Sequence, residues 1–155
     1  MQGNFKPMSS MKKTAHYLML SAILIAFTTT SCKKYEQGPD FSILPKKERL
    51  ANNWKMETYM EDGVEKTTTF NNLFQNALFT IESDGDYTLT YKPLGITNYS
   101  ETGTWRFVNS KEDFETNPTS GVGSVAVHHI LKLKDKELWY VDTENGVKKE
   151  YHLIP

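Results

Sequence analysis

The chain is poor in cysteine, has no large excess of charge of either sign, and contains no hydrophobic run long enough to cross a membrane. Its 18 basic and 19 acidic residues give a net charge of −1, which leaves no basic surface of the kind that nucleic-acid binding requires. The longest uncharged and mostly apolar run, Tyr17–Phe27, has 11 residues, whereas a membrane-spanning helix needs about 20. Nucleic acids are therefore excluded as partners, and a protein with several membrane spans is excluded as a class.

Motifs of catalysis, phosphate binding and metal binding are also missing. The single cysteine, Cys32, cannot form an intramolecular disulfide bond. The chain contains no Gly-x-Ser-x-Gly nucleophile motif, and Gly121–Gly123 lacks the spacing and the Lys-Ser/Thr pair of a phosphate-binding loop. Ser83–Asp86 lacks the distal glutamate of a calcium-binding loop. We therefore expect no enzymatic activity, no cofactor and no metal site.

The first 31 residues differ from the rest of the chain in charge and hydropathy. They contain three lysines and no acidic residue, and the apolar run Tyr17–Phe27 is followed by the small residues Thr28–Ser31. A basic start, a short apolar run and a stretch of small residues form the pattern of a secretory signal peptide. We therefore interpret residues 1–31 as a signal peptide whose true start is Met11.

The lone cysteine stands where bacterial lipoproteins carry their lipid-modified residue. The sequence Thr29-Thr30-Ser31-Cys32 resembles the lipobox of lipoproteins of the Bacteroidetes type, which implies that Cys32 is acylated and becomes the mature N-terminus. Two or more acyl chains anchor a protein stably, whereas one chain alone binds a membrane only marginally. The resemblance implies an outer-membrane anchor and leaves open whether the protein faces the periplasm or the cell exterior. Residues 32–47, polar and broken by Gly38-Pro39, are expected to form a flexible tether.

From Leu50 onward, apolar and polar residues alternate, which is the pattern of strands with one face buried. Asp62-Gly63, Asp84-Gly85 and Asn145-Gly146 are turn signals between such segments, because Asp, Asn and Gly tolerate positive φ. Asp135-Lys136 is a fourth, weaker turn that is inferred from its flanks. The pattern predicts eight strands, at residues 51–60, 64–70, 77–82, 87–92, 101–108, 124–134, 137–142 and 147–153.

Little of the chain between these strands has a helical pattern. Lys46–Leu50 is expected to form one helical turn before the first strand, and Phe70–Gln75 a short 3₁₀ turn or a loop. Asn109–Gly123 is the longest predicted loop, and loops of this length are often lids, binding elements or mobile segments. A connecting loop without a functional role is an equally open interpretation of this segment.

Eight antiparallel strands connected in sequence order within residues 48–155 are expected to close into an up-and-down barrel. The predicted fold class is therefore all-β, with a β-sandwich as the alternative. A barrel of eight strands has an interior that side chains fill or that holds one small ligand. The aromatic content, 12% of the chain, favours a packed fold over a disordered chain.

Three segments of the body resemble the lipocalin-like domains of Bacteroidetes lipoproteins. They are LANNWKMETY from residue 50, GTWRF from residue 103, and the final hairpin that begins KLKDKELWYVD at residue 132. The resemblance covers residues 48–155 and implies a lipocalin-like barrel in which Trp54 opens the first strand. The chain departs from true lipocalins in having Asn52 in place of the glycine of Gly-x-Trp, and no arginine after Arg106 to cap that tryptophan.

The strand alternation also assigns side chains to the inside of the barrel. Six aromatic residues take inward positions, and His129 joins them because it shares its face with Leu131 and Leu133. Its neighbour His128 then points the other way, so the two cannot bind one metal ion together. Aromatic residues with polar groups line ligand cavities, and they also fill cores. The candidate ligand-binding residues are Tyr87, Tyr91, Trp105, Phe107, His129 and Tyr140, and Tyr151 has the same inward parity.

Two functions are left open by these residues. One is a monomeric envelope lipoprotein that binds a small apolar or amphipathic molecule inside its barrel. The other is a structural or interaction module with a solid barrel, which contacts a protein or glycan through loops that expose Leu94, Ile96 and Tyr99. Three carboxylates are interpreted as parts of solvated strand faces, those of Glu57, Glu82 and Glu101.

Overall fold

The computed structural model describes residues 43–155, which are mostly β-structure. The predicted signal peptide, Cys32 and most of the predicted tether lie outside the described residues. By its internal contacts the chain divides into Met1–Cys32 and Lys33–Pro155, and the second unit contains every described strand and the described core. Since it has a core of its own, this unit is expected to fold by itself. None of the helices in residues 43–155 combines the length and the apolar character that crossing a membrane requires.

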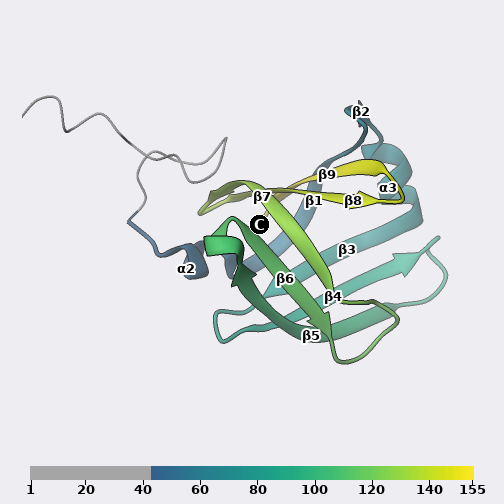
Figure 1. Ribbon diagram of the computed structural model, residues 1–155. Helices are drawn as coiled ribbons and strands as arrows, with labels where there is room; N and C mark the ends of the chain where they lie inside the picture. Colours follow the sequence, from purple (N-terminus) through teal and green to yellow (C-terminus); the bar gives the residue numbers. More distant parts are fainter. Residues whose placement is uncertain (1–42) are drawn as a thin grey trace, which may run out of the picture. The chain divides into compact units, whose positions relative to one another are not determined.

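In the described part of the chain, eight strands form one closed antiparallel barrel (Figure 1). Each strand pairs with the next one around the barrel, and β9 pairs back onto β1, which closes it. The short β2 pairs with the end of β1. The predicted up-and-down barrel is therefore confirmed, and the alternative of a sandwich is wrong. The strands are β1 (Asn52–Glu61), β2 (Val64–Glu65), β3 (Phe74–Ile81), β4 (Asp86–Pro93), β5 (Tyr99–Val108), β6 (Asp113–Pro118), β7 (Ala126–Lys134), β8 (Glu137–Glu144) and β9 (Val147–Ile154).

The predicted hairpin turns connect strands where the backbone takes positive φ. Asp62 and Gly63 have φ of 49° and 78°, and Asn145 and Gly146 have φ of 52° and 81°. Two consecutive residues in this left-handed region match a type I′ turn, whose twist fits that of the flanking strands. The weaker turn at 135–136 is confirmed as well, since β7 and β8 pair on either side of it.

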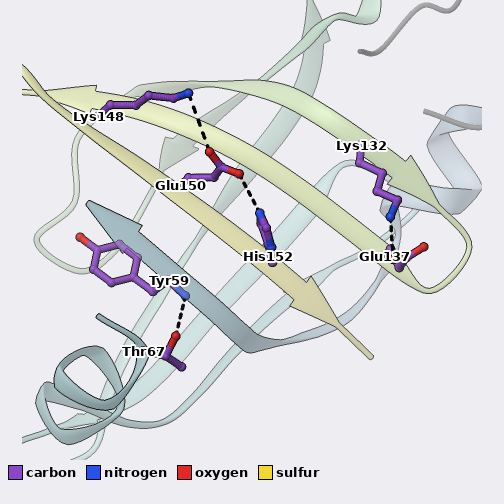
Figure 2. A network of polar contacts seen from close by, with 7 residues as sticks. All are labelled: Tyr59, Thr67, Lys132, Glu137, Lys148, Glu150 and His152. Atoms are coloured by element: carbon purple, nitrogen blue, oxygen red, sulfur yellow. Dashed lines mark hydrogen bonds and ion pairs between the residues drawn. The ribbon is translucent and has the colours of Figure 1, made fainter. Parts of the chain in front are cut away.

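The predicted strand at residues 64–70 is wrong, because most of it belongs to a helix, α3 (Thr67–Leu73). The backbone N–H of Tyr59 donates to Oγ1 of Thr67 at 3.0 Å, so the first residue of α3 is tied to β1 (Figure 2). The helix also replaces the turn predicted at Phe70–Gln75. A run of three threonines is typical of a strand, and here a tertiary contact overrides that local preference.

Helix α3 covers a gap in the barrel wall. The ladder between β1 and β3 involves Asn52–Lys55 of β1 and stops there, and α3 packs against both strands beyond it. Phe70 of the helix lies with its ring centroid 5.0 Å from that of Tyr59 and 4.9 Å from that of Phe74. Aromatic packing therefore takes the place of the missing ladder hydrogen bonds.

The predicted loop at Asn109–Gly123 contains a barrel strand. After the short 3₁₀ helix η1 (Asn109–Lys111), β6 runs between β5 and β7 and pairs with both. Phe114 and Thr116 are buried, while Glu115 between them forms an ion pair with Arg106 on the outside. The alternation was hidden in the sequence because most positions of β6 are polar. The predicted number of eight strands is nevertheless right, because β6 takes the place of the strand at 64–70.

The antiparallel connections sort the loops between two ends of the barrel. One end, which we call the closed end, has α2 (Lys46–Leu50), the β3–β4 and β7–β8 turns and the C-terminus. The other, the open end, has α3, the β4–β5 loop at 94–98, the β6–β7 loop at 119–125 and the β8–β9 turn. Figure 1 shows α2 and α3 at opposite ends of the barrel. Helix α2 confirms the helical turn that the sequence predicted before the first strand.

The closed end is tightly packed. Leu50 of α2 is fully buried, and its carbonyl oxygen accepts a hydrogen bond of 2.8 Å from the indole N–H of Trp54. The guanidinium of Arg49 donates to the carbonyl oxygen of Leu133 at 2.6 Å. This arginine belongs to α2 and so precedes the first strand of the barrel. The buried core consists of Leu50, Trp54, Ile81, Tyr87, Trp105, Phe114, Ile130, Leu133, Leu138 and Leu153.

Candidate ligand-binding cavity

A cavity of about 350 Å³ lies inside the barrel, above the core of the closed end. It extends from Trp54 to the loop at 119–125, and the small side chains of Ala77 and Ala126 leave space in its wall. The apolar lining residues are Trp54, Met56, Phe70, Phe74, Ala77, Phe79, Leu89, Ala126 and Leu153. The other lining residues are Tyr87, Tyr91, Glu101, Thr116, Gly123, Ser124, His128, Tyr140 and Tyr151.

Three of the six candidate residues line this cavity, and two lie below it. Tyr87, Tyr91 and Tyr140 are lining residues. Trp105 and Phe107 face inward, but they belong to the closed end of β5, where the indole N–H of Trp105 donates to the Glu82 carbonyl at 2.8 Å and the two rings pack edge to face. The assignment of these two as ligand-binding residues is therefore corrected to a core role. The alternation of residues along a strand predicts whether a side chain faces into the barrel, but not how far along the barrel axis it lies.

The sixth candidate, His129, points out of the barrel. A register shift lies between Ile130 and Lys132, so Leu131 is an extra residue in β7 and the inward parity changes there. His129 has a side chain that is 51% exposed, and its Nδ1 bonds to Oδ1 of Asp113 at 2.6 Å. His128 points into the cavity instead. The prediction that the two histidines face opposite sides is confirmed, but which of them faces inward was wrong.

His128 is held between two polar groups. Its Nδ1 lies 2.8 Å from Oδ1 of Asp142, and its Nε2 lies 3.0 Å from Oγ1 of Thr116. Its ring stacks on Phe114 with centroids 4.6 Å apart and meets Tyr140 edge-on at 5.2 Å. The order hydroxyl, imidazole, carboxylate is that of a catalytic triad, which the sequence motifs did not predict. Hydrogen bonds and stacking together fix the orientation of the imidazole in the cavity wall.

Glu101 places a buried carboxylate in the same cavity, with 8% of the residue exposed. Its Oε1 accepts a hydrogen bond of 2.9 Å from Tyr87 Oη, and its Oε2 accepts one of 2.9 Å from Tyr99 Oη and one of 3.0 Å from the Gly123 N–H. The interpretation of Glu101 as part of a solvated strand face is therefore wrong. The signal was present in the sequence, because Glu101 has the same parity on β5 as Trp105.

The tyrosines of the barrel interior stay neutral well into the alkaline range. Burial raises the pKa of Tyr87 above its usual value, and the hydrogen bond to Glu101 raises it further. Burial also raises the pKa of Tyr140 and Tyr151, with Asp142 as the next cause for both. Neutral hydroxyl groups can both donate and accept hydrogen bonds. The cavity therefore combines apolar walls with several uncharged polar groups and one carboxylate.

The outside of the barrel carries a separate polar network on β7, β8 and β9. Figure 2 shows Glu150 between Lys148 and His152, with Oε1 of Glu150 2.8 Å from Nε2 of His152. The His152 ring stacks on Trp139 with centroids 3.9 Å apart, and Nζ of Lys132 lies 3.9 Å from the centroid of the same indole. Within residues 43–155, no group of three or more His, Cys, Asp or Glu could hold a metal ion. These contacts stabilise the outer face of the sheet and do not reach the cavity.

Comparison with solved structures finds partly similar chains at very low sequence identity. One is a lipocalin-like protein from Bacteroides uniformis, 10% identical, with a TM-score of 0.49 over 66% of this chain and 96% of that chain. Another is an uncharacterized protein from Bacteroides eggerthii, 9% identical, with a TM-score of 0.46 over 66% of this chain and 97% of that chain. No protein-family model and no curated protein matches the sequence.

Proposed function

We propose that this chain is a binding protein that takes a small apolar or amphipathic molecule into its barrel. The observation that supports the proposal is the cavity of about 350 Å³ with its largely aromatic wall. Pockets for small molecules typically measure about 300–1,000 Å³ and combine apolar walls with a few fixed polar groups. Here the fixed polar groups are Glu101, held by three hydrogen bonds, and His128, held by two.

Native mass spectrometry of residues 33–155 tests this proposal, because that unit contains the whole described barrel. Protein secreted into a bacterial periplasm and purified gently is expected to carry a mass above that of the polypeptide, lost on collisional activation. Ala126→Phe fills the cavity and should abolish the added mass. Val127→Phe places the same ring on the outside, at a position 50% exposed, and should retain it. Equal added mass in both variants would place any bound molecule elsewhere.

We further propose that the protein is a monomeric lipoprotein anchored in the outer membrane through acylated Cys32. The support is the sequence: a basic, apolar and small-residue leader ends at the single cysteine. The chain enters the barrel through α2 at the closed end, and the loops beside the cavity lie at the opposite, open end. Labelling with a palmitate analogue is expected to mark the wild-type chain and not Cys32→Ser. Only the labelled wild-type chain should partition into the detergent phase.

Binding rather than catalysis is the activity we propose for the barrel. Thr116 lies within β6, whose backbone groups pair with β5 and with β7, so the ladder uses the N–H groups that an oxyanion site would need. The Thr116 hydroxyl keeps hydrogen-bonding capacity beyond its contact with His128 and serves as a hydrogen-bonding group for a ligand. Incubation with p-nitrophenyl esters of short acids should release no more p-nitrophenol from the wild type than from Thr116→Val.

The second candidate function is an interaction module, and exposed apolar residues at the open end favour it. Leu94 and Ile96 of the β4–β5 loop are 61% and 81% exposed, as the sequence suggested. Val122 and Val125 of the neighbouring loop are 86% and 59% exposed, whereas Tyr99 is half-buried against Glu101. Crosslinking in intact envelopes should capture a protein or glycan with the wild type and lose it with Leu94→Ser and Ile96→Ser combined, if this function is the right one.

A further inference from the structure

We propose that the barrel takes an amphipathic organic cation, an amine whose ammonium group reaches Glu101 and whose apolar part fills the aromatic region of the cavity. This inference rests on the proposed binding function and names the chemical class of its ligand.

The charge of the cavity wall is the first argument. Among the described residues that line it there is one carboxylate, Glu101, and neither lysine nor arginine. Within residues 43–155 no cationic side chain forms an ion pair with Glu101. Its three hydrogen-bond donors are all neutral groups. They leave the negative charge of the carboxylate without a cationic partner among the described residues.

A buried charge without a counter-ion attracts a cation strongly, because the interior screens charge far less than water does. A carboxylate offers about four acceptor sites, and three of those on Glu101 are used. Because Glu101 itself lines the cavity, the remaining acceptor site is available to a donor bound there. A ligand ammonium group can supply both the hydrogen bond and the missing positive charge.

The aromatic rings beside Glu101 favour the same ligand. Tyr91 lies with its ring centroid 4.6 Å from that of Tyr99, and Phe74 meets Tyr91 edge-on at 5.2 Å. Ring faces attract cations within about 6 Å, and more strongly where water is excluded. Glu101 is also one of the causes, after burial and Tyr99, that raise the pKa of Tyr91. Its negative potential therefore extends along the wall to Tyr91.

His128 does not offset this potential. The imidazole lies 2.8 Å from the carboxylate of Asp142, so a protonated His128 is neutralised by its own partner. A neutral His128 leaves the negative charge of Asp142 in place. In either state the pair adds no net positive charge to the cavity. An anionic ligand such as a fatty acid would therefore meet the carboxylate of Glu101 with no described cation to receive it.

Three probes with the same eight-carbon chain test the inference: octan-1-amine, octan-1-ol and octanoate. The amine is protonated at pH 7, as a lysine side chain is. Binding to residues 33–155 is measured by calorimetry and by tryptophan fluorescence, to which Trp54 in the cavity wall contributes. The amine is expected to bind at least tenfold more tightly than the alcohol, and octanoate more weakly than both.

Variants assign the preference to one residue. Glu101→Gln keeps the shape of the side chain and should abolish the preference for the amine over the alcohol. Glu57→Gln removes the same charge from an exposed position of β1 and should leave all three affinities unchanged. If Glu101→Gln does not fold, as circular dichroism would show, the wild-type ranking of amine and alcohol decides by itself.

The outcomes separate the inference from the proposed function. Octan-1-ol or octanoate binding as tightly as the amine would overturn the inference while supporting a binding barrel. Preference for the amine that persists in Glu101→Gln would also overturn it, because the cation would then be recognised elsewhere. If none of the three probes binds, the result counts against the proposed function itself.

Discussion

Glu101 accepts a hydrogen bond of 3.0 Å from the backbone N–H of Gly123, so a buried carboxylate inside the barrel holds the loop that borders its cavity. Gly121 of the same loop lies so close to Tyr99 that a Cβ at position 121 would be 2.7 Å from the tyrosine Oη. The absence of side chains at both glycines lets the loop approach the carboxylate. The position of the loop at 119–125 is therefore coupled to the polar group on which ligand recognition is proposed to depend.

Gly123→Ala tests this coupling. A Cβ at this position would overlap Oε2 of Glu101, so the loop or the carboxylate has to move. We expect a loss of about 1–3 kcal/mol in the free energy of unfolding, as for other overpacked sites, and weaker binding of octan-1-amine. Val122→Ala, at a position 86% exposed, is the control and should change stability by less than about 0.5 kcal/mol. Urea unfolding of both variants makes the comparison, and equal stabilities would contradict the coupling.

Alanine at His128 and at His129 should have unequal effects. His128→Ala removes a ring that stacks on Phe114 and leaves the buried hydroxyl of Thr116 without its partner. A loss of about 1–3 kcal/mol in unfolding free energy is expected, together with a change in ligand affinity. His129→Ala removes a half-exposed partner of Asp113, worth at most about 1 kcal/mol. Thermal unfolding measures the loss of stability in both variants. A larger loss in His129→Ala than in His128→Ala would contradict the assignment of His128 as the inward-facing histidine.

Trp105→Phe and Tyr91→Ala should distinguish a core residue from a residue of the cavity wall. Trp105→Phe removes the indole N–H that donates to the Glu82 carbonyl, and we expect lower stability with unchanged affinity for octan-1-ol. Tyr91→Ala opens the cavity wall and should weaken binding several-fold. The urea midpoint and calorimetric titration are measured on both variants. Weaker binding of octan-1-ol by Trp105→Phe than by Tyr91→Ala would show that Trp105 belongs to the ligand site.

Alkaline pH should destabilise the barrel through its buried tyrosines. Within residues 43–155, five tyrosines have pKa values raised above the usual value, in each case mainly by burial; they are Tyr59, Tyr87, Tyr91, Tyr140 and Tyr151. Below pH about 10, tyrosine is neutral in both the folded and the unfolded chain, so these groups cause no change in stability. Above that pH the unfolded chain releases protons that the folded chain retains, so unfolding becomes more favourable as pH rises. The urea midpoint of unfolding should stay constant from pH 8 to about 10 and fall between there and pH 11. A midpoint that stays constant up to pH 11 would contradict the burial of these tyrosines.

Hydropathy patterning was sufficient to predict the barrel but not to place every strand. The strands whose exposed and buried positions differ clearly in polarity, such as the one from Tyr87 to Tyr91, were found. The strand at Asp113–Pro118 was missed because Thr116, although buried, is polar. The segment at 64–70 was misassigned because most of it forms α3, which tertiary contacts such as the one between Tyr59 and Thr67 hold against β1.

The candidate site was predicted in part, for reasons that are geometrical. Alternation along β5 placed Trp105 inside correctly, yet it cannot report how far along the barrel a residue lies. The same alternation already pointed to Glu101, which was assigned to the surface because of its charge. At His128 and His129, one extra residue, Leu131, reverses the assignment, and nothing in a single sequence marks such a bulge.

The pairing of β1 with β9 also determines when this protein can fold. Lys55 pairs with Ile154, so contacts between residues about a hundred positions apart complete the barrel. Proteins dominated by such long-range contacts fold slowly. Until the last residues of the chain are available, β1 and β8 both present unpaired backbone groups, which are templates for association with other chains. A chain interrupted before Val147, during synthesis or by proteolysis, is therefore left with open edges and is an aggregation hazard rather than a weakened version of the whole protein.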